Sequence, residues 1–155
     1  MTAPAAPPLS IDDRGVRDAL RAKTLRIVTV SKRGRPMIMP LWFVVRDGRI
    51  CMTNAATSPT VRNIAANPRV LILVEARDGH LLHIRGEARY LTNNEALGPV
   101  ARRSALKYYA DPRALWLYAR NVRRIPAMLQ YYRERTDTGV IEVTPVSFEW
   151  TDARP

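Results

Sequence analysis

A run of small polar residues between Thr53 and Asn63 is the part of this sequence best suited to bind a ligand. It reads Thr-Asn-Ala-Ala-Thr-Ser-Pro-Thr-Val-Arg-Asn. The run follows a predicted strand and precedes a predicted helix, where backbone N–H groups and short hydroxyl side chains can bind an anion. Arg62 adds a planar guanidinium that suits phosphate oxygens. The residue types therefore predict a phosphate-binding loop.

The same loop also has a purely structural interpretation. Thr57 or Ser58 can cap the helix, with Pro59 at the first helical position, as in many helices that bind nothing. Residue types alone leave both interpretations open.

Other residues that could do chemistry are scarce. Cys51 is the single cysteine, and it falls in a predicted strand, where we expect a structural role. His80 and His83 flank a predicted strand start without a cluster of cysteines or carboxylates, so we expect no metal site. No Ser/His/Asp or paired-carboxylate arrangement can be read, and the catalytic residues stay unknown.

Length and charge limit the possible classes. A chain of 155 residues with 46% hydrophobic residues can bury one core, so we expect a flexible tail over 1–9 and a single domain over 10–155. No apolar run approaches the roughly 20 residues that span a bilayer, and we expect a cytoplasmic protein that does not enter membranes. The formal charge of +11 attracts polyanions. Nucleic acid is not favoured, because the basic residues are scattered and no nucleic-acid motif occurs.

The hydrophobic pattern predicts the elements that position the loop. An Asp47-Gly48 pair predicts a hairpin turn, and Gly86 predicts a bulge or bend. The apolar run from Val70 to Val74 predicts a strand buried on both faces, and Ser10 is expected to cap the first helix. We expect strands over 24–31, 37–46, 50–53, 70–74, 80–91 and 139–150, and helices over 11–22, 61–66, 93–109 and from 112 onward. This order predicts a mainly β fold with helices (α+β), a small closed or half-closed antiparallel barrel.

A helical insert at about 93–135 carries many basic and aromatic residues. The charges could frame the mouth of a groove and bind an anionic substrate, and the aromatic residues could cover a bound ring. We favour instead the solvated face of amphipathic helices for most of the charges, and core or subunit interface for the aromatic residues. The aromatic residues are Tyr108, Tyr109, Trp116, Tyr131 and Tyr132. Arg123 and Arg124 are the best candidates to line a groove. The basic residues of the insert are Arg102, Arg103, Lys107, Arg113, Arg120, Arg123 and Arg124.

Several short motifs occur in an order that is more specific than any one of them. They are Gly34-Arg35-Pro36, Pro40-Leu41-Trp42-Phe43, Asp47-Gly48, Thr53-Asn54 with Ser58, Arg62-Asn63-Ile64, Asn67-Pro68-Arg69-Val70 and Gly86-Glu87-Ala88. In this order the chain resembles the pyridoxamine 5'-phosphate oxidase-like superfamily of split β-barrel proteins, which includes flavin- and deazaflavin-dependent oxidoreductases. The resemblance covers about 20–91 and the last strand. It implies a six-stranded antiparallel split β-barrel with flanking helices.

The resemblance also implies a function. Such proteins are homodimers that hold FMN or the deazaflavin coenzyme F-420 in grooves between the subunits and transfer hydride to or from a small organic substrate. The ring would be flanked by Pro40, Leu41 and Trp42, and the phosphate would be surrounded by Thr53, Asn54, Ser58, Thr60 and Arg62. Many relatives carry a lysine where this chain has Thr60, so the loop has lost one cation.

A second function class remains open. The chain has no obvious acid or base near the expected groove, which is compatible with a non-catalytic protein that binds or carries a flavin, haem or another tetrapyrrole. Turnover with a reductant and candidate acceptors would separate an enzyme from a carrier.

Overall fold

The computed structural model describes residues 7–92, 94–109, 112–120, 123 and 137–151. The helices are α1 (Arg14–Ala19), α2 (Pro59–Ala66), α3 (Asn94–Tyr109) and α4 (Pro112–Arg120). The strands are β1 (Thr24–Val30), β2 (Pro36–Trp42), β3 (Val44–Arg46), β4 (Arg49–Ala55), β5 (Arg69–Glu75), β6 (Leu81–Leu91) and β7 (Thr138–Thr151). In this part of the chain seven strands form one antiparallel sheet in the order β2-β1-β5-β6-β7-β4-β3.

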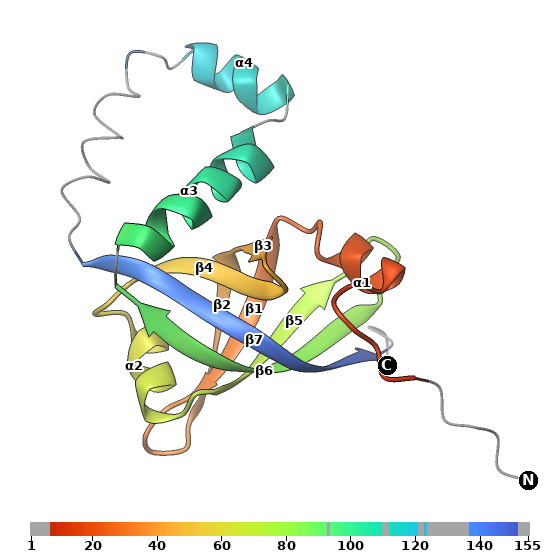
Figure 1. Cartoon of the computed structure of the whole chain (residues 1–155), viewed down its shortest axis with the longest axis vertical. Helices are drawn as coiled ribbons and strands as arrows, with labels where there is room; N and C mark the ends of the chain where they lie inside the picture. Colours follow the sequence, from red (N-terminus) through yellow and green to blue (C-terminus); the bar gives the residue numbers. More distant parts are fainter. Residues whose placement is uncertain (1–6, 93, 110–111, 121–122, 124–136, 152–155) are drawn as a thin grey trace, which may run out of the picture.

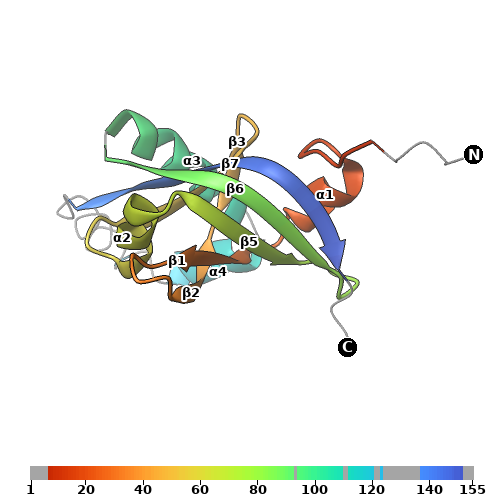
Figure 2. The same cartoon turned by 90° about the horizontal axis from the view of Figure 1, so that it is seen from below.

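The sheet curls into a half-closed barrel because its two outer strands are neighbours in the chain. Strands β2 and β3 lie at opposite ends of the strand order, yet Phe43 alone joins them. The curl brings β6 and β7 over β1 and β2, as Figure 2 shows. The fold is therefore a mainly antiparallel α+β split barrel, as predicted from the sequence.

The predicted strand count of six was wrong, because the expected strand over 37–46 is broken at Phe43. This residue leaves the sheet, and the side chain of Tyr108 takes over its backbone hydrogen bonds. The Phe43 N–H donates to the Tyr108 hydroxyl at 2.9 Å, and the Phe43 carbonyl oxygen also lies 2.9 Å from that hydroxyl. A buried peptide group needs such partners once it leaves a sheet.

Two glycine predictions are confirmed. Asp47 and Gly48 have φ values of 51° and 73°, the backbone of a tight hairpin turn between β3 and β4. Gly86 lies at a register shift between β6 and β7. A Cβ atom placed on Gly86 would lie 2.7 Å from the carbonyl oxygen of Thr144, so only glycine allows the two strands to approach this closely.

The strands alternate between a buried inner face and an outer face, and the inner faces form the main core. Strand β5 follows the same rule. Its Val70, Ile72 and Val74 are buried, whereas Leu71 and Leu73 are half-buried on the outer face. The expectation that this apolar run is buried on both faces was therefore wrong for the single chain.

Helix α1 is shorter than predicted and begins at Arg14 rather than Ile11. Ser10 starts a turn instead of the helix: its carbonyl accepts the Asp13 N–H, and its hydroxyl accepts the Asp12 N–H. Asp13 therefore occupies the N-cap position, although its side chain makes no cap hydrogen bond.

Helix α3 covers the outer face of the sheet at β3, β4 and β7, and α4 extends from it away from the barrel (Figure 1). Val100 of α3 packs against Val44, Cys51 and Val140, which form a second small core. Predictions that concern Asn93, Arg124 and the rest of the insert beyond 123 lie outside the described residues. Of the helices described here, none has the length and apolar character needed to cross a membrane.

Candidate functional site

Ser58 caps helix α2. The Ser58 hydroxyl accepts a hydrogen bond from the Val61 N–H at 3.2 Å, and Pro59 is the first helical residue. This arrangement satisfies one of the free N–H groups of the first turn. The structural interpretation of the loop is thus confirmed. It does not exclude a ligand, because the hydroxyl still has a hydrogen to donate.

Two other residues of the predicted phosphate site, Thr60 and Asn54, are directed into the protein or bind its own groups. Thr60 is fully buried, and its hydroxyl has no hydrogen-bond partner within the described part of the chain. The Asn54 side chain accepts the neighbouring Ala55 N–H at 2.9 Å, and the Asn54 carbonyl accepts the Tyr90 hydroxyl at 2.9 Å. Asn54 therefore shapes the start of the loop.

The exposed polar side chains of the loop are Thr53, Thr57 and Arg62, and Ser58 is half-buried. The Arg62 guanidinium forms no ion pair with any carboxylate that the structure describes. Arg62 lies one helical turn after Ser58, and its backbone N–H donates to the Ser58 carbonyl oxygen at 3.1 Å. This unpaired cation beside hydroxyl groups is chemically suited to an anion.

The predicted ring-binding residues lie at the end of β2. Pro40 and Trp42 are exposed on the outer face of the strand, whereas Leu41 is half-buried and packs against the core. The Trp42 side chain is 57% exposed although it is large and apolar. One face of its indole stacks on the Tyr108 ring at a centroid distance of 4.6 Å and an interplanar angle of 17°.

Tyr108 and the neighbouring Lys107 belong to the insert, where the sequence favoured a core or interface ring and a solvated charge over a role near the groove. The Lys107 ammonium donates to the carbonyl oxygens of Phe43 at 3.0 Å and Leu20 at 3.4 Å, and it lies 3.6 Å from the centre of the Phe43 ring. Burial lowers the pKa of Lys107 to about 8 and raises the pKa of Tyr108. No local signal indicates that these residues meet Phe43, because the contacts join distant segments.

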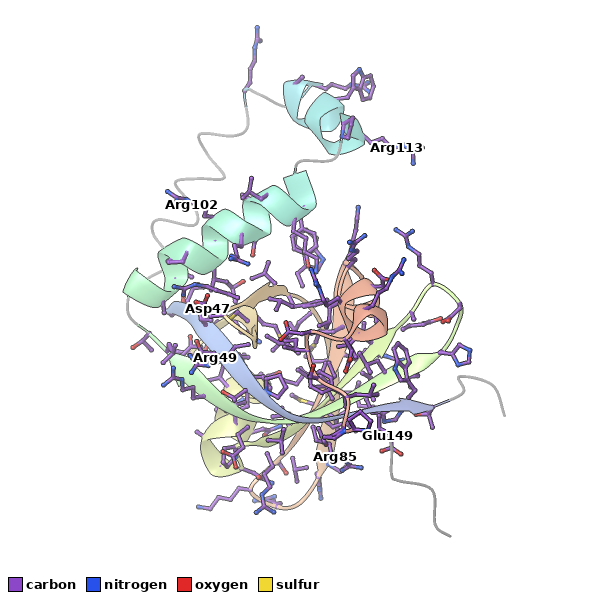
Figure 3. The ribbon with its side chains drawn as sticks, turned by 45° about the vertical axis from the view of Figure 1, so that its right-hand side comes forward. Asp47, Arg49, Arg85, Arg102, Arg113 and Glu149 are labelled. Carbon is purple, nitrogen blue, oxygen red and sulfur yellow. The ribbon has the colours of Figure 1, made fainter. Side chains whose placement is uncertain are left out.

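Lys107, which is half-buried, is an exception to the expectation that most basic residues of the insert are solvated, and exposed Arg103 also contacts the barrel. The Arg103 guanidinium donates to the carbonyl oxygen of Val45 at 2.8 Å. Arg102, by contrast, is exposed on the side of α3 that faces away from the barrel (Figure 3). Helix α3 is therefore attached to the barrel through two of its cations.

The two groups of predicted site residues do not meet within one chain. Helix α2 lies at the lower left of Figure 1, and its Asn63 side chain donates to Thr29, which lies opposite Met37 near the start of β2. Trp42 is the last residue of β2. The structure therefore presents the start of α2, with its exposed Arg62, and the exposed Trp42 toward opposite ends of the barrel.

Cys51 has the structural role expected from its position. It is buried in β4, and its pKa is raised to about 11, first by burial and second by the charge of Glu142. Such a thiol stays protonated and unreactive at neutral pH. Among the residues described, no three His, Cys, Asp or Glu side chains are grouped as a metal site would require.

The comparisons with known proteins agree with the fold. The family model of pyridoxamine 5'-phosphate oxidase matches residues 14–150. A search of curated proteins gives no match.

Three solved structures illustrate the likeness. One is an F-420 reductase with 20% identity and a TM-score of 0.63, covering 88% of this chain and 97% of that one. Another is a conserved hypothetical protein from Mycobacterium tuberculosis with 20% identity and a TM-score of 0.69, covering 99% and 91%. The third is the haem storage protein HutZ from Vibrio cholerae with 16% identity and a TM-score of 0.57, covering 91% and 94%. At these identities the likeness concerns the fold.

Proposed function

Because the chain belongs to the pyridoxamine 5'-phosphate oxidase family, we propose that it is an oxidoreductase that uses FMN or coenzyme F-420. It would transfer hydride to or from a small organic substrate. The observation that carries this proposal is the exposed Arg62 guanidinium, which pairs with no described carboxylate and lies in the first turn of α2, the helix that Ser58 caps. Both cofactors contain a phosphate group that such a pair can bind.

The residues of this chain would bind and orient the cofactor, which itself supplies the hydride chemistry. Arg62 would form paired hydrogen bonds with two phosphate oxygens, and Ser58 would donate its hydroxyl hydrogen while it continues to cap the helix. Buried Thr60 supplies no charge, so Arg62 takes over the role of the lysine that many relatives have nearby. Thr53 and Thr57 add exposed hydroxyl groups at the same loop.

The proposal includes a homodimer. The outer face of the sheet carries an apolar stripe in which Val28 lies opposite Ile38 on one side and Leu71 on the other. Ile38 is 58% exposed in the single chain. A second copy that covers this stripe would bury it, since two-fold symmetric dimers are the commonest assemblies.

A dimer would also explain the separation of the two candidate surfaces. In one chain α2 contacts Thr29 near the start of β2, whereas Trp42 lies at the end of that strand. A groove between two subunits could combine the anion-binding loop of one protomer with the aromatic surface of its partner.

The test is a titration of the purified protein with FMN and, separately, with F-420. We expect saturable binding of one of them, weakened by about tenfold or more in Arg62→Gln, since one charge-assisted contact contributes about 1.5–3 kcal/mol. Arg17→Gln on the exposed face of α1 is the matched control and should bind like the wild type. Absence of binding to both cofactors would refute the proposal.

The second candidate is a haem-binding protein without turnover. Its support is the fold shared with the haem storage protein HutZ and with a haem-binding protein from Mycobacterium smegmatis. His80 and His83 are the chain's two histidines and would be the candidate iron ligands. Haem titration followed by absorbance, with His80→Ala and His83→Ala variants, tests this reading: loss of the haem spectrum in one variant would support it.

A further inference from the structure

Trp42 is unusual because it is both exposed and held in place. One face of its indole lies on the Tyr108 ring, while 57% of the side chain remains accessible. Burial of such a large apolar surface would be favourable. The stack leaves one face of the indole open to a flat partner.

The Tyr108 ring is held firmly beneath it. Tyr108 is only 7% exposed. Its hydroxyl accepts the Phe43 N–H at 2.9 Å and lies within hydrogen-bonding distance of two carbonyl oxygens, that of Lys23 at 2.6 Å and that of Phe43 at 2.9 Å. A ring with these contacts cannot swing aside when a ligand arrives.

Lys107 supports the same junction from the neighbouring position. Its ammonium binds the Phe43 carbonyl, which Tyr108 also contacts, and the Leu20 carbonyl at the end of α1. Lys107 and Tyr108 therefore clamp the residue that follows Trp42 and fix the direction in which the indole points.

We infer that Tyr108 of α3 is a positioning residue that holds Trp42 as a stacking platform for the planar tricyclic ring of a flavin or deazaflavin. This inference rests on the proposed function and extends it, since it makes the helical insert part of the ring site. Trp42 would contact the ring directly, and Tyr108 would act through Trp42. Stacking on an aromatic residue changes affinity for a planar base by roughly 5- to 150-fold.

The experiment uses the full chain labelled with 5-fluorotryptophan and fluorine NMR, with FMN and F-420 as the titrants. The three resonances are assigned with Trp42→Phe, Trp116→Phe and Trp150→Phe. At saturation the Trp42 resonance should shift through the ring current of the stacked cofactor, and by more than the other two. Trp116 is the matched control, because it is 63% exposed but lies beside Arg120 rather than on a tyrosine.

Substitutions then separate stacking from folding. Trp42→Leu changes an exposed side chain, so the protein should stay folded and bind the cofactor about 5- to 150-fold more weakly. Tyr108→Leu should weaken binding and reduce the circular dichroism that the bound ring acquires. Tyr108→Phe keeps the stacked ring but loses its hydroxyl contacts, so it should retain more of that signal than Tyr108→Leu and less than the wild type.

The possible failures are distinguishable. If the wild type binds a cofactor but the Trp42 resonance does not shift and Trp42→Leu binds equally well, the platform is refuted while the proposed function stands. If the wild type binds neither cofactor, the proposed function and the platform are both refuted.

Discussion

The Lys107 side chain links several elements through its ammonium group, and burial lowers the pKa of that group. Its ammonium contacts the end of α1 and the junction between β2 and β3. Hydrogen bonds to carbonyl oxygens replace only part of its lost hydration, and its pKa falls to about 8. A lysine of this kind titrates within the range in which proteins are commonly handled.

We predict that Lys107 makes stability depend on pH. Because its pKa is lower in the folded state, the unfolded chain binds the proton more tightly, so the free energy of unfolding rises with pH between about 8 and 10.5. Lys107→Met should lack this rise. The raised pKa of Cys51 acts in the opposite direction but is present in both proteins, so it cancels in their difference. Urea unfolding at several pH values measures the effect, and parallel stability curves would contradict it.

A second prediction concerns Gly86. Because a Cβ atom there would lie 2.7 Å from the Thr144 carbonyl oxygen, Gly86→Ala must push β6 and β7 apart and should cost about 2–4 kcal/mol. Gly98→Ala is the control, since a Cβ on Gly98 in α3 meets nothing within 4 Å. The control should gain about 0.5–1 kcal/mol of stability. Equal urea midpoints for the two variants would show that the close approach at Gly86 is unimportant.

Local chemistry explains which residue roles were predictable. The Ser58 cap and the Gly86 bulge follow from preferences that act within a few residues, and both are confirmed. The contact between Tyr108 and Phe43 spans 65 positions in the chain. No periodicity or turn signal encodes such a contact, so the sequence favoured a core or interface position for Tyr108 without indicating its partner. Its buried ring fits that general expectation but not its particular partner.

At the scale of elements, the start of helix α2 has two proposed roles: Ser58 caps the helix, and it binds the cofactor phosphate. Two substitutions of Ser58 can distinguish these roles. Ser58→Ala should cost about 1 kcal/mol through loss of the cap. Ser58→Asp should keep the cap and the favourable interaction with the helix dipole, so its stability should stay near that of the wild type. Its negative charge should nevertheless repel the cofactor phosphate. Thermal unfolding and FMN or F-420 titration of both variants test this, and undiminished binding by Ser58→Asp would place the phosphate elsewhere.

The order of elements was easier to predict than their ends. The hairpin at Asp47 and Gly48 and the helix after Ser58 were predicted at the right positions, because turns and caps have strong residue preferences. The break at Phe43 was missed, since the apolar pattern continues across it and only α3 supplies the compensating hydrogen bonds. The start of α1 was misplaced because Ser10 and Asp13 both have the residue types of a cap.

At the scale of the whole molecule, the apolar stripe on the outer face of the sheet should control assembly. Ile38→Glu places a charge in that stripe and should convert the proposed dimer into a monomer that remains folded. Leu106→Glu is the matched control, because Leu106 on α3 is 65% exposed and lies outside the stripe. Sedimentation or light scattering gives the molar mass. A dimer that survives Ile38→Glu would refute this interface.

The position of β7 in the sheet has a consequence for how the protein is made. Strand β7 lies between β6 and β4, so it completes the middle of the sheet although it comes after all the other strands in the chain. During synthesis on the ribosome, the edges of β6 and β4 that pair with β7 therefore stay unpaired until residues 138–151 have been made. Exposed edges of this kind recruit other strands. The nascent chain should accordingly depend on chaperones during this interval, and the seven-stranded sheet forms only when β7 is inserted between β6 and β4.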